Sequence, residues 1–406
     1  MKLAILGATG SIGRSALDLA RTFPERLEIT ALTCAGQVEP LARAIVAHRP
    51  KLVAVLSPKE RRALMVILGD MGLKALPKIV CGPEGYLEVA VAAEADVVLS
   101  AIVGLAGLAP TMAAVEYGRK VALANKEALV VGGELIMPLA RKTGAQIIPV
   151  DSEHSAIFQV LGGLSCPGDV RRLILTASGG PFRGLKAEDL EKVTLDEALN
   201  HPRWKMGPKI TCDSATMMNK GLELIEAHHL FGLGYDDLEV VVHPQSVVHA
   251  LVEFIDGTQS AVLGPTDMRM VIAYALSHPG RWPLLPVPSG DGLADFFALD
   301  LPRFAFNQWR GHLTFEEPDS DTFKCLRLAE EAGRSGGTAP TILTSANEEA
   351  VSLFLAGVIG FADIPRLVQQ TLEAIPAVHL TGIDQAVAVA DEARRMAKSF
   401  SLDLRR

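Results

Sequence analysis

Two acidic residues follow a short apolar segment near the middle of the chain, in the stretch PVDSEHSAIFQ (residues 149–159). Asp151 and Glu153 are two positions apart at the end of an expected strand, so their carboxylates are predicted to share one face. Two oxygen ligands on one face suit a hard divalent cation such as Mg²⁺ or Mn²⁺, which keeps positions open for substrate oxygens. The same residues also fit a helix start, with Asp151 or Ser152 as the N-cap. The spacing alone favours neither interpretation.

The segment HPRWKMGPKITCDSATMMNKGLELIEAHH (residues 201–229) gathers many groups that can bind a ligand. Its first part combines prolines, a glycine and a tryptophan, which is typical of a loop that covers a site. Ser214, Asn219 and Lys220 then offer hydroxyl, amide and ammonium donors around an expected helix start, which suits a phosphate. Glu223 and Glu226 lie on neighbouring helical faces and could complete a metal site, although a solvated helix face would also explain them.

A glycine-rich turn follows the first expected strand. Gly7, Gly10 and Gly13 match the pattern GxxGxxG, a relative of the dinucleotide fingerprint, and they open an expected helix. Glycine lets the backbone approach a pyrophosphate, which then lies on the amides of the helix N-terminus. The end of the second expected strand carries no carboxylate for a ribose 2′-hydroxyl, which favours NADP over NAD. No Arg or Lys directly replaces that carboxylate.

A lysine stands immediately after another expected strand, in ALANKEALV (residues 122–130). A neutral turn would serve a plain fold better at this position, so Lys126 is expected to contact a ligand.

Short apolar segments alternate with helix-like segments in the first third of the chain, which predicts βαβ units and a parallel, doubly wound α/β sheet. The expected strands are residues 3–6, 27–32, 52–56, 97–103, 120–124 and 146–150. We expect an N-terminal Rossmann-like domain (1–150), a central α/β catalytic domain (151–277) with a lid loop at about 179–208, a linker (278–308), and a C-terminal helical domain (309–406). Within the central domain, Asp256-Gly257 predicts a hairpin.

Composition narrows the class of partner. The 406 residues carry a formal charge of −8 without a basic stripe, which disfavours nucleic acid and anionic membranes. The five cysteines are odd in number and never form CxxC, so reduced thiols in a cytoplasm are expected. Residues 97–115 are uncharged, but Gly104, Gly107 and Pro110 interrupt them, which argues against a membrane span. The N-terminal apolar run is too short for a signal peptide.

Several long motifs together resemble those of the 1-deoxy-D-xylulose 5-phosphate reductoisomerase family, in the same order and over nearly the whole chain. They are GATGSIG, ALANKEALV, PVDSEHSAIFQ, LTASGGPFR, HPRWKMGPKITCDSATMMNKGLELIEA, VVHPQSVVHALVEFIDG, LTFEEPDSDTFKCLRLAEEA and SANEEAVSLFLAG. The resemblance implies an enzyme of isoprenoid precursor synthesis. It would rearrange 1-deoxy-D-xylulose 5-phosphate and reduce the resulting aldehyde with NADPH, giving 2-C-methyl-D-erythritol 4-phosphate. A divalent cation (Mg²⁺, Mn²⁺ or Co²⁺), a small-molecule sugar phosphate as substrate and a homodimer are also implied.

The resemblance also implies roles for individual residues. Metal ligands would be Asp151, Glu153 and Glu223, with Lys126 and Ser152 beside the reacting carbons. Substrate contacts would come from Ser178, His201, Ser214, Asn219 and Lys220. The two serines, Asn219 and Lys220 would lie mainly at the phosphate, with Trp204 and Met206 in a flexible lid. NADPH contacts would come from Thr9, Gly10, Ser11, Ile12, Gly36, Asn125, Glu127 and Gly207. Gln37 and Val38 depart from the family, whose members often carry Lys or Arg followed by Asn there, so the preference for NADPH over NADH is open.

Two other functions remain open at this point. A simple NAD(P)-dependent dehydrogenase would use the glycine turn and the sheet, but it would leave the acidic residues and the phosphate donors without a role. A non-catalytic nucleotide sensor would use the fold alone.

Overall fold

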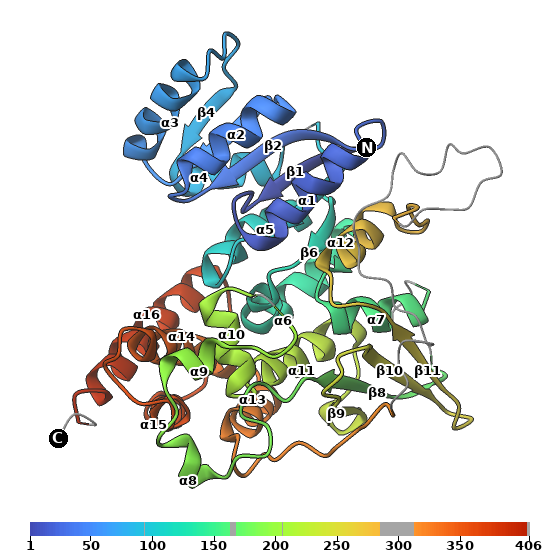
Figure 1. Cartoon of the computed structure of the whole chain (residues 1–406), viewed down its shortest axis with the longest axis vertical. Coiled ribbons are helices and arrows are strands. Elements are labelled where there is room, and N and C mark those ends of the chain that lie inside the picture. Colours follow the sequence, from blue (N-terminus) through green and yellow to red (C-terminus); the bar gives the residue numbers. More distant parts are fainter. Residues whose placement is uncertain (93, 163–167, 205, 285–311, 404–406) are drawn as a thin grey trace. The chain divides into compact units, whose positions relative to one another are not determined.

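The structure is a computed structural model that describes residues 1–92, 94–162, 168–204, 206–284 and 312–403 (Figure 1). It divides into two compact units. The first comprises Met1–Ala128, Ile136–Ser155 and Asp267–Pro302, and the second comprises Leu129–Leu135, Ala156–Thr266 and Arg303–Arg406.

A seven-stranded parallel sheet forms the centre of the first unit, in the order β4-β3-β2-β1-β5-β6-β7. Its strands are β1 (Lys2–Leu6), β2 (Glu28–Cys34), β3 (Leu52–Val55), β4 (Lys78–Cys81), β5 (Val97–Ser100), β6 (Lys120–Leu123) and β7 (Ile147–Pro149). The central strands are buried along nearly their whole length, as strands covered by helices on both faces must be. The strand order reverses between β1 and β5, and ligands bind at the carboxyl ends of the strands beside such a switch point. The predicted Rossmann-like, doubly wound fold is confirmed.

One strand of this sheet escaped prediction. β4 lies at the sheet edge and has only four residues, of which Ile79 alone is buried. An edge strand with one buried side chain has neither an apolar run nor a clear alternation, so its sequence gives little signal.

Among the described residues, six helices lie wholly in this unit: α1 (Ser11–Thr22), α2 (Val38–His48), α3 (Pro58–Asp70), α4 (Gly82–Ala90), α5 (Leu108–Glu116) and α12 (Met268–Ser277). A further helix, α6 (Lys126–Thr143), begins and ends in this unit, but its residues Leu129–Leu135 belong to the second. The uncharged stretch 97–115 is divided between β5, a 3₁₀ turn (Leu105–Gly107) and α5. No helix among the described residues is long and apolar enough to cross a membrane.

The second unit contains a four-stranded sheet in the order β11-β10-β8-β9. Its strands are β8 (Val170–Ala177), β9 (Leu238–Val242), β10 (Val248–Phe254) and β11 (Gln259–Leu263). β10 and β11 pair antiparallel on either side of Gly257, whose φ of 84° needs glycine in the turn, so the hairpin prediction is confirmed.

Helices make up the rest of the second unit. They are α8 (Ala187–Leu190), α9 (Leu195–Leu199), α10 (Pro208–Ala215), α11 (Met218–Phe231), α13 (Lys324–Ser335), α14 (Ala339–Leu355), α15 (Asp363–Ala374) and α16 (Ile383–Phe400). α7 (Ser152–Val160) begins in the first unit and continues into the second. The expected C-terminal helical region is therefore present. Most of the expected linker (278–308) lies outside the described residues, and the exact domain boundaries stay predictions.

Candidate active site

The glycine turn after β1 leaves no room for side chains where the chain enters α1. A Cβ at Gly13 would lie 2.3 Å from the Gly7 carbonyl oxygen, and one at Gly7 would lie 2.5 Å from the Ala101 carbonyl oxygen. The N-cap of α1 is Gly10, which has no side chain that could accept hydrogen bonds from the first amides of the helix. Backbone amides at such a helix N-terminus are the groups that can bind an anion.

The residues predicted to contact NADPH around this turn lie at the carboxyl edge of the sheet. Thr9 Oγ1 lies 3.2 Å from Cys34 Sγ at the end of β2, and the Gly7 amide donates to Thr33 Oγ1 at 2.8 Å. Ser11 and Ile12 open α1. Beyond β2, Gly36 and Gln37 are exposed. Apart from the two neighbouring residues in the sequence, no atom lies within 4 Å of the position that a Cβ would occupy at Gly36.

Lys126 is the first residue of α6, directly after β6 on the same sheet edge. Asn125 caps this helix, because its Oδ1 accepts from the Ala128 amide at 2.9 Å while its Nδ2 donates to the carbonyl oxygens of Ile102 and Gly104. Lys126 is buried, and its Nζ lies 2.5 Å from Asp151 Oδ2. A lysine ammonium is thus held beside a carboxylate that was predicted to bind metal.

The strand assigned to Asp151 and Glu153 is wrong. β7 ends at Pro149, and α7 begins at Ser152, so Glu153 lies in the first turn of a helix. The Asp151 carbonyl accepts from the Ser155 amide at 2.8 Å, which puts Asp151 at the N-cap position. Ser152 donates to the Glu153 carboxylate. Strand alternation therefore does not bring the two carboxylates together; the helix start does.

In the second unit, His201 links two serines that were predicted to bind phosphate. Its Nε2 lies 3.0 Å from Ser178 Oγ and 3.1 Å from Ser214 Oγ. Its Nδ1 accepts from the backbone amides of Arg203 and Trp204 at 3.2 and 2.9 Å, so the proton of the neutral ring is on Nε2. Burial lowers the pKa of His201, which favours that neutral form.

Three predicted residues on α11 contact one another. Asn219 Nδ2 donates to Glu223 Oε1 at 2.5 Å, and the Lys220 ammonium pairs with Glu223 Oε2. Lys220 and Glu223 are both almost fully buried, at 3% and 1% exposure. The solvated-face alternative for the glutamates is therefore wrong, since Glu226 is buried as well.

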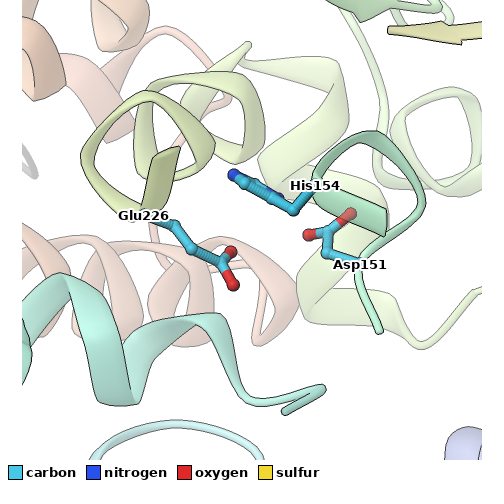
Figure 2. A group of neighbouring side chains, drawn as sticks. All are labelled: Asp151, His154 and Glu226. Carbon is cyan, nitrogen blue, oxygen red and sulfur yellow. The ribbon is translucent and has the colours of Figure 1, made fainter. Parts of the chain in front are cut away.

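Two sets of three side chains have ligand atoms within 4.8 Å of one another. One is Asp151, Glu153 and Glu223, the set that was predicted to hold the metal. The other is Asp151, His154 and Glu226, whose side chains Figure 2 shows around a common space. Sequence reasoning missed His154 as a candidate ligand, although it lies three positions after Asp151 and such a spacing places two residues on one side of a helix turn.

The other predicted site residues are distributed as follows. Glu127 is buried in the first turn of α6, Gly207 is the N-cap of α10, and Trp204 and Met206 are half-buried before that helix. Their predicted contacts with cofactor and substrate stay predictions.

Comparisons with known proteins cover nearly the whole chain. Models of the 1-deoxy-D-xylulose 5-phosphate reductoisomerase family match residues 3–133, that family's C-terminal domain model matches 147–231, and the DXP reductoisomerase C-terminal domain model matches 263–396. The enzyme of that name from Chlorobaculum tepidum is 51% identical over 92% of each chain, and that from Gloeobacter violaceus is 50% identical over 92% of this chain and 90% of its own.

Solved structures agree with the sequence relatives. The Zymomonas mobilis reductoisomerase in complex with NADPH is 39% identical, with a TM-score of 0.86 over 98% of each chain. A reductoisomerase in complex with NADPH, fosmidomycin and magnesium is 39% identical, with a TM-score of 0.87 over 100% of this chain and 99% of that one. The chain therefore belongs to the 1-deoxy-D-xylulose 5-phosphate reductoisomerase family.

Proposed function

We propose that this chain converts 1-deoxy-D-xylulose 5-phosphate to 2-C-methyl-D-erythritol 4-phosphate, with NADPH as reductant and a divalent cation (Mg²⁺, Mn²⁺ or Co²⁺). The observation that carries the proposal is the match to reductoisomerase family models along the chain, together with relatives that bind NADPH and magnesium.

NADPH fits the carboxyl edge of the parallel sheet. The turn at Gly7–Gly13 needs glycine, because a Cβ at Gly7 or Gly13 would clash with main-chain atoms of the protein itself. It brings backbone amides to the N-terminus of α1, where a pyrophosphate would lie. Gly10, Ser11 and Ile12 would contact the pyrophosphate, and Gln37 would lie toward the adenosine ribose. Asn125 and Glu127 would lie toward the nicotinamide, since β6 is on the other side of the switch point from β2.

A hard divalent cation fits the acidic donor set. Asp151, Glu153 and Glu223 supply carboxylate oxygens, the ligand type that Mg²⁺ and Mn²⁺ prefer. A bound cation would act as a Lewis acid on the substrate's oxygens. Lys126, which is buried beside Asp151, would orient an oxygen whose charge changes during the carbon shift.

The phosphate end of the substrate fits the donors of the second unit. Ser178 and Ser214 present hydroxyls, and the Nε2–H of His201 lies within hydrogen-bond distance of both oxygens, so the hydroxyl protons can donate to an anion. Asn219 and Lys220 add an amide and an ammonium at the start of α11. Lys220 is nearly inaccessible to water, so its charge interacts strongly with an anion that reaches it.

Two finer expectations stay predictions. The four-stranded sheet of the second unit is the region that we expect to form a homodimer, and a cytoplasmic location is expected from the reduced cysteines. The four cysteines in the described part of the chain are free.

Product identification tests the reaction. Protein supplied with the ketose phosphate, NADPH and Mg²⁺ should yield the branched polyol phosphate by carbon NMR. A simple dehydrogenase would give an unbranched polyol, and a nucleotide sensor would bind NADPH and give no product. The synthetic aldehyde 2-C-methylerythrose 4-phosphate should also be reduced, because one site carries out both steps.

A further inference from the structure

A buried carboxylate stands immediately before Ser214 on α10. Asp213 is 1% exposed, and its Oδ1 accepts a hydrogen bond from Asn347 Nδ2 at 2.7 Å. Its Oδ2 lies 2.8 Å from the ammonium of Lys209, one helical turn earlier. A buried charge of this kind requires such partners. Asn347 is the one that reaches α10 from another helix, α14.

Asn347 is expected to lower the stability of the core in which it lies. Its side chain is fully buried, and its Oδ1 accepts no hydrogen bond from any described residue. A buried amide with an unsatisfied oxygen lowers stability, so an apolar residue would serve packing better. The amide is therefore better explained by its directed bond to Asp213 than by a contribution to the stability of the helical bundle.

The bond holds a helix that carries phosphate donors. Ser214 Oγ lies 3.1 Å from His201 Nε2, which in turn contacts Ser178. The turn after Ser178 packs on the same helix, because a Cβ at Gly180 would lie 2.8 Å from the Ser214 carbonyl oxygen. α10 is thus fixed by the Gly180 turn and, through Asp213, by α14.

We propose that Asn347 is a positioning residue for the phosphate of the substrate. Through its bond to Asp213 it sets the rotation of α10, and with it the place of Ser214 and His201. The C-terminal helices would therefore determine affinity for the phosphate without contacting it. This inference rests on the assignment of Ser214 and His201 to the phosphate in the proposed function.

The first test is Asn347→Ala, compared with Thr344→Val on the same helix. Thr344 is also buried, and its hydroxyl makes no hydrogen bond to a described residue, so Thr344→Val is a matched core change without a bond to Asp213. Asn347→Ala should raise KM for 1-deoxy-D-xylulose 5-phosphate about tenfold and change kcat less than twofold, because binding of the phosphate is weakened equally in ground and transition states. Thr344→Val should leave KM unchanged. NADPH affinity, measured by fluorescence titration, should be unchanged in both variants.

The second test exchanges the two partners. Asp213→Asn and Asn347→Asp should each raise KM. The double variant restores a bond between an amide and a carboxylate across α10 and α14 but leaves Lys209 without its carboxylate partner, so its KM should be lower than that of either single variant without reaching the wild-type value. This rescue also decides the matter if Asn347→Ala fails to fold.

Folded Asn347→Ala with wild-type KM would overturn the inference, and so would a double variant no better than the two single ones. Equal KM increases in Asn347→Ala and Thr344→Val would overturn it too, because a change in the core of α14 that keeps the bond to Asp213 would then have the same effect as losing that bond. If wild-type protein did not turn over the ketose, the proposed function would fail and this inference with it; unchanged KM beside normal wild-type turnover removes the inference alone.

Discussion

The glycine turn of the first unit and the α10–α11 region of the second are both predicted to bind anions, but they use different groups to do so. The turn offers backbone amides and excluded volume, with Gly7 and Gly13 pressed against main-chain atoms. The α10–α11 region instead offers charges that neutralise one another. Lys220 and Glu223 are both buried, and the half-buried Lys209 pairs with the buried Asp213. A backbone site is damaged by adding atoms. A site of paired buried charges is damaged by removing one partner, which leaves the other uncompensated.

The largest effect is expected from Glu223→Gln. Loss of one of three carboxylates should lower kcat by at least about 10³-fold, a barrier increase of roughly 4 kcal/mol, because the metal site is incomplete. NADPH binding should survive, since its predicted contacts lie mainly on the other unit. Steady-state kinetics and NADPH titration measure the two effects separately. Glu226→Gln is the matched control: an equal loss there would favour the set of Asp151, His154 and Glu226 as the functional one.

The next largest effect is expected from removing the lysine ammonium of Lys220 from the α10–α11 region. Lys220→Ala should lower kcat/KM by an amount that corresponds to a loss of roughly 2 to 4 kcal/mol in transition-state stabilisation. The reason is that a buried phosphate contact is lost and Glu223 loses its partner. The loss should be similar for the ketose and for the branched aldehyde, whose phosphate end is the same. A loss for only one of the two would remove Lys220 from the phosphate site.

Acid should lower the stability of the second unit because of His249, which lies on β10. Burial lowers the pKa of His249 from 6.5 to about 4, so the folded state binds its proton less tightly than the unfolded state. The stability that it contributes is complete above pH 6.5 and is lost as the pH falls toward 4, by about 3 kcal/mol in total. Urea unfolding at pH 7 and pH 4.5 should show this loss, and His249→Gln should reduce it. An unchanged pH dependence in His249→Gln would exclude this residue as a cause.

The backbone site is tested by a pair of glycine substitutions. Gly13→Ala would place its Cβ 2.3 Å from the Gly7 oxygen and 2.6 Å from Ala8 Cα, so it should cost about 1–3 kcal/mol of stability and weaken NADPH binding. Gly10→Ala meets only the Gly7 oxygen at 3.4 Å, and its stability should stay within about 0.5 kcal/mol of wild type. Equal unfolding midpoints for the two variants would contradict the steric account of the turn.

The smallest effect is expected at Gln37. Gln37→Arg should tighten NADPH relative to NADH by roughly 1 kcal/mol, because a charge-assisted hydrogen bond to the 2′-phosphate is partly offset by ordering of the side chain. The ratio of the two dissociation constants measures this directly. The same change in both constants would show that residue 37 does not contact the 2′-phosphate.

The two regions also differ in how far sequence could predict them. The glycine turn and its flanking strands follow local sequence patterns, so the position of the turn at the carboxyl ends of the parallel strands could be predicted. The residues of α11 were found through chemical type, but their mutual pairing was not, because Asn219 and Lys220 were expected to be available to phosphate rather than bonded to Glu223. The bond from Asp213 to Asn347 joins residues 134 positions apart, and no local pattern indicates which buried amide meets which carboxylate.

In the proposed function, one chain couples a metal-dependent rearrangement to reduction by NADPH. The most direct measurement adds the ketose phosphate and NADPH to protein freed of metal by a chelator, follows absorbance of NADPH, and then supplies Mg²⁺ in excess. We predict no oxidation of NADPH before the addition, and afterwards one NADPH consumed for each molecule of branched product. Oxidation of NADPH at nearly the full rate in the presence of the chelator, or consumption of NADPH without a branched product, would contradict the proposed function.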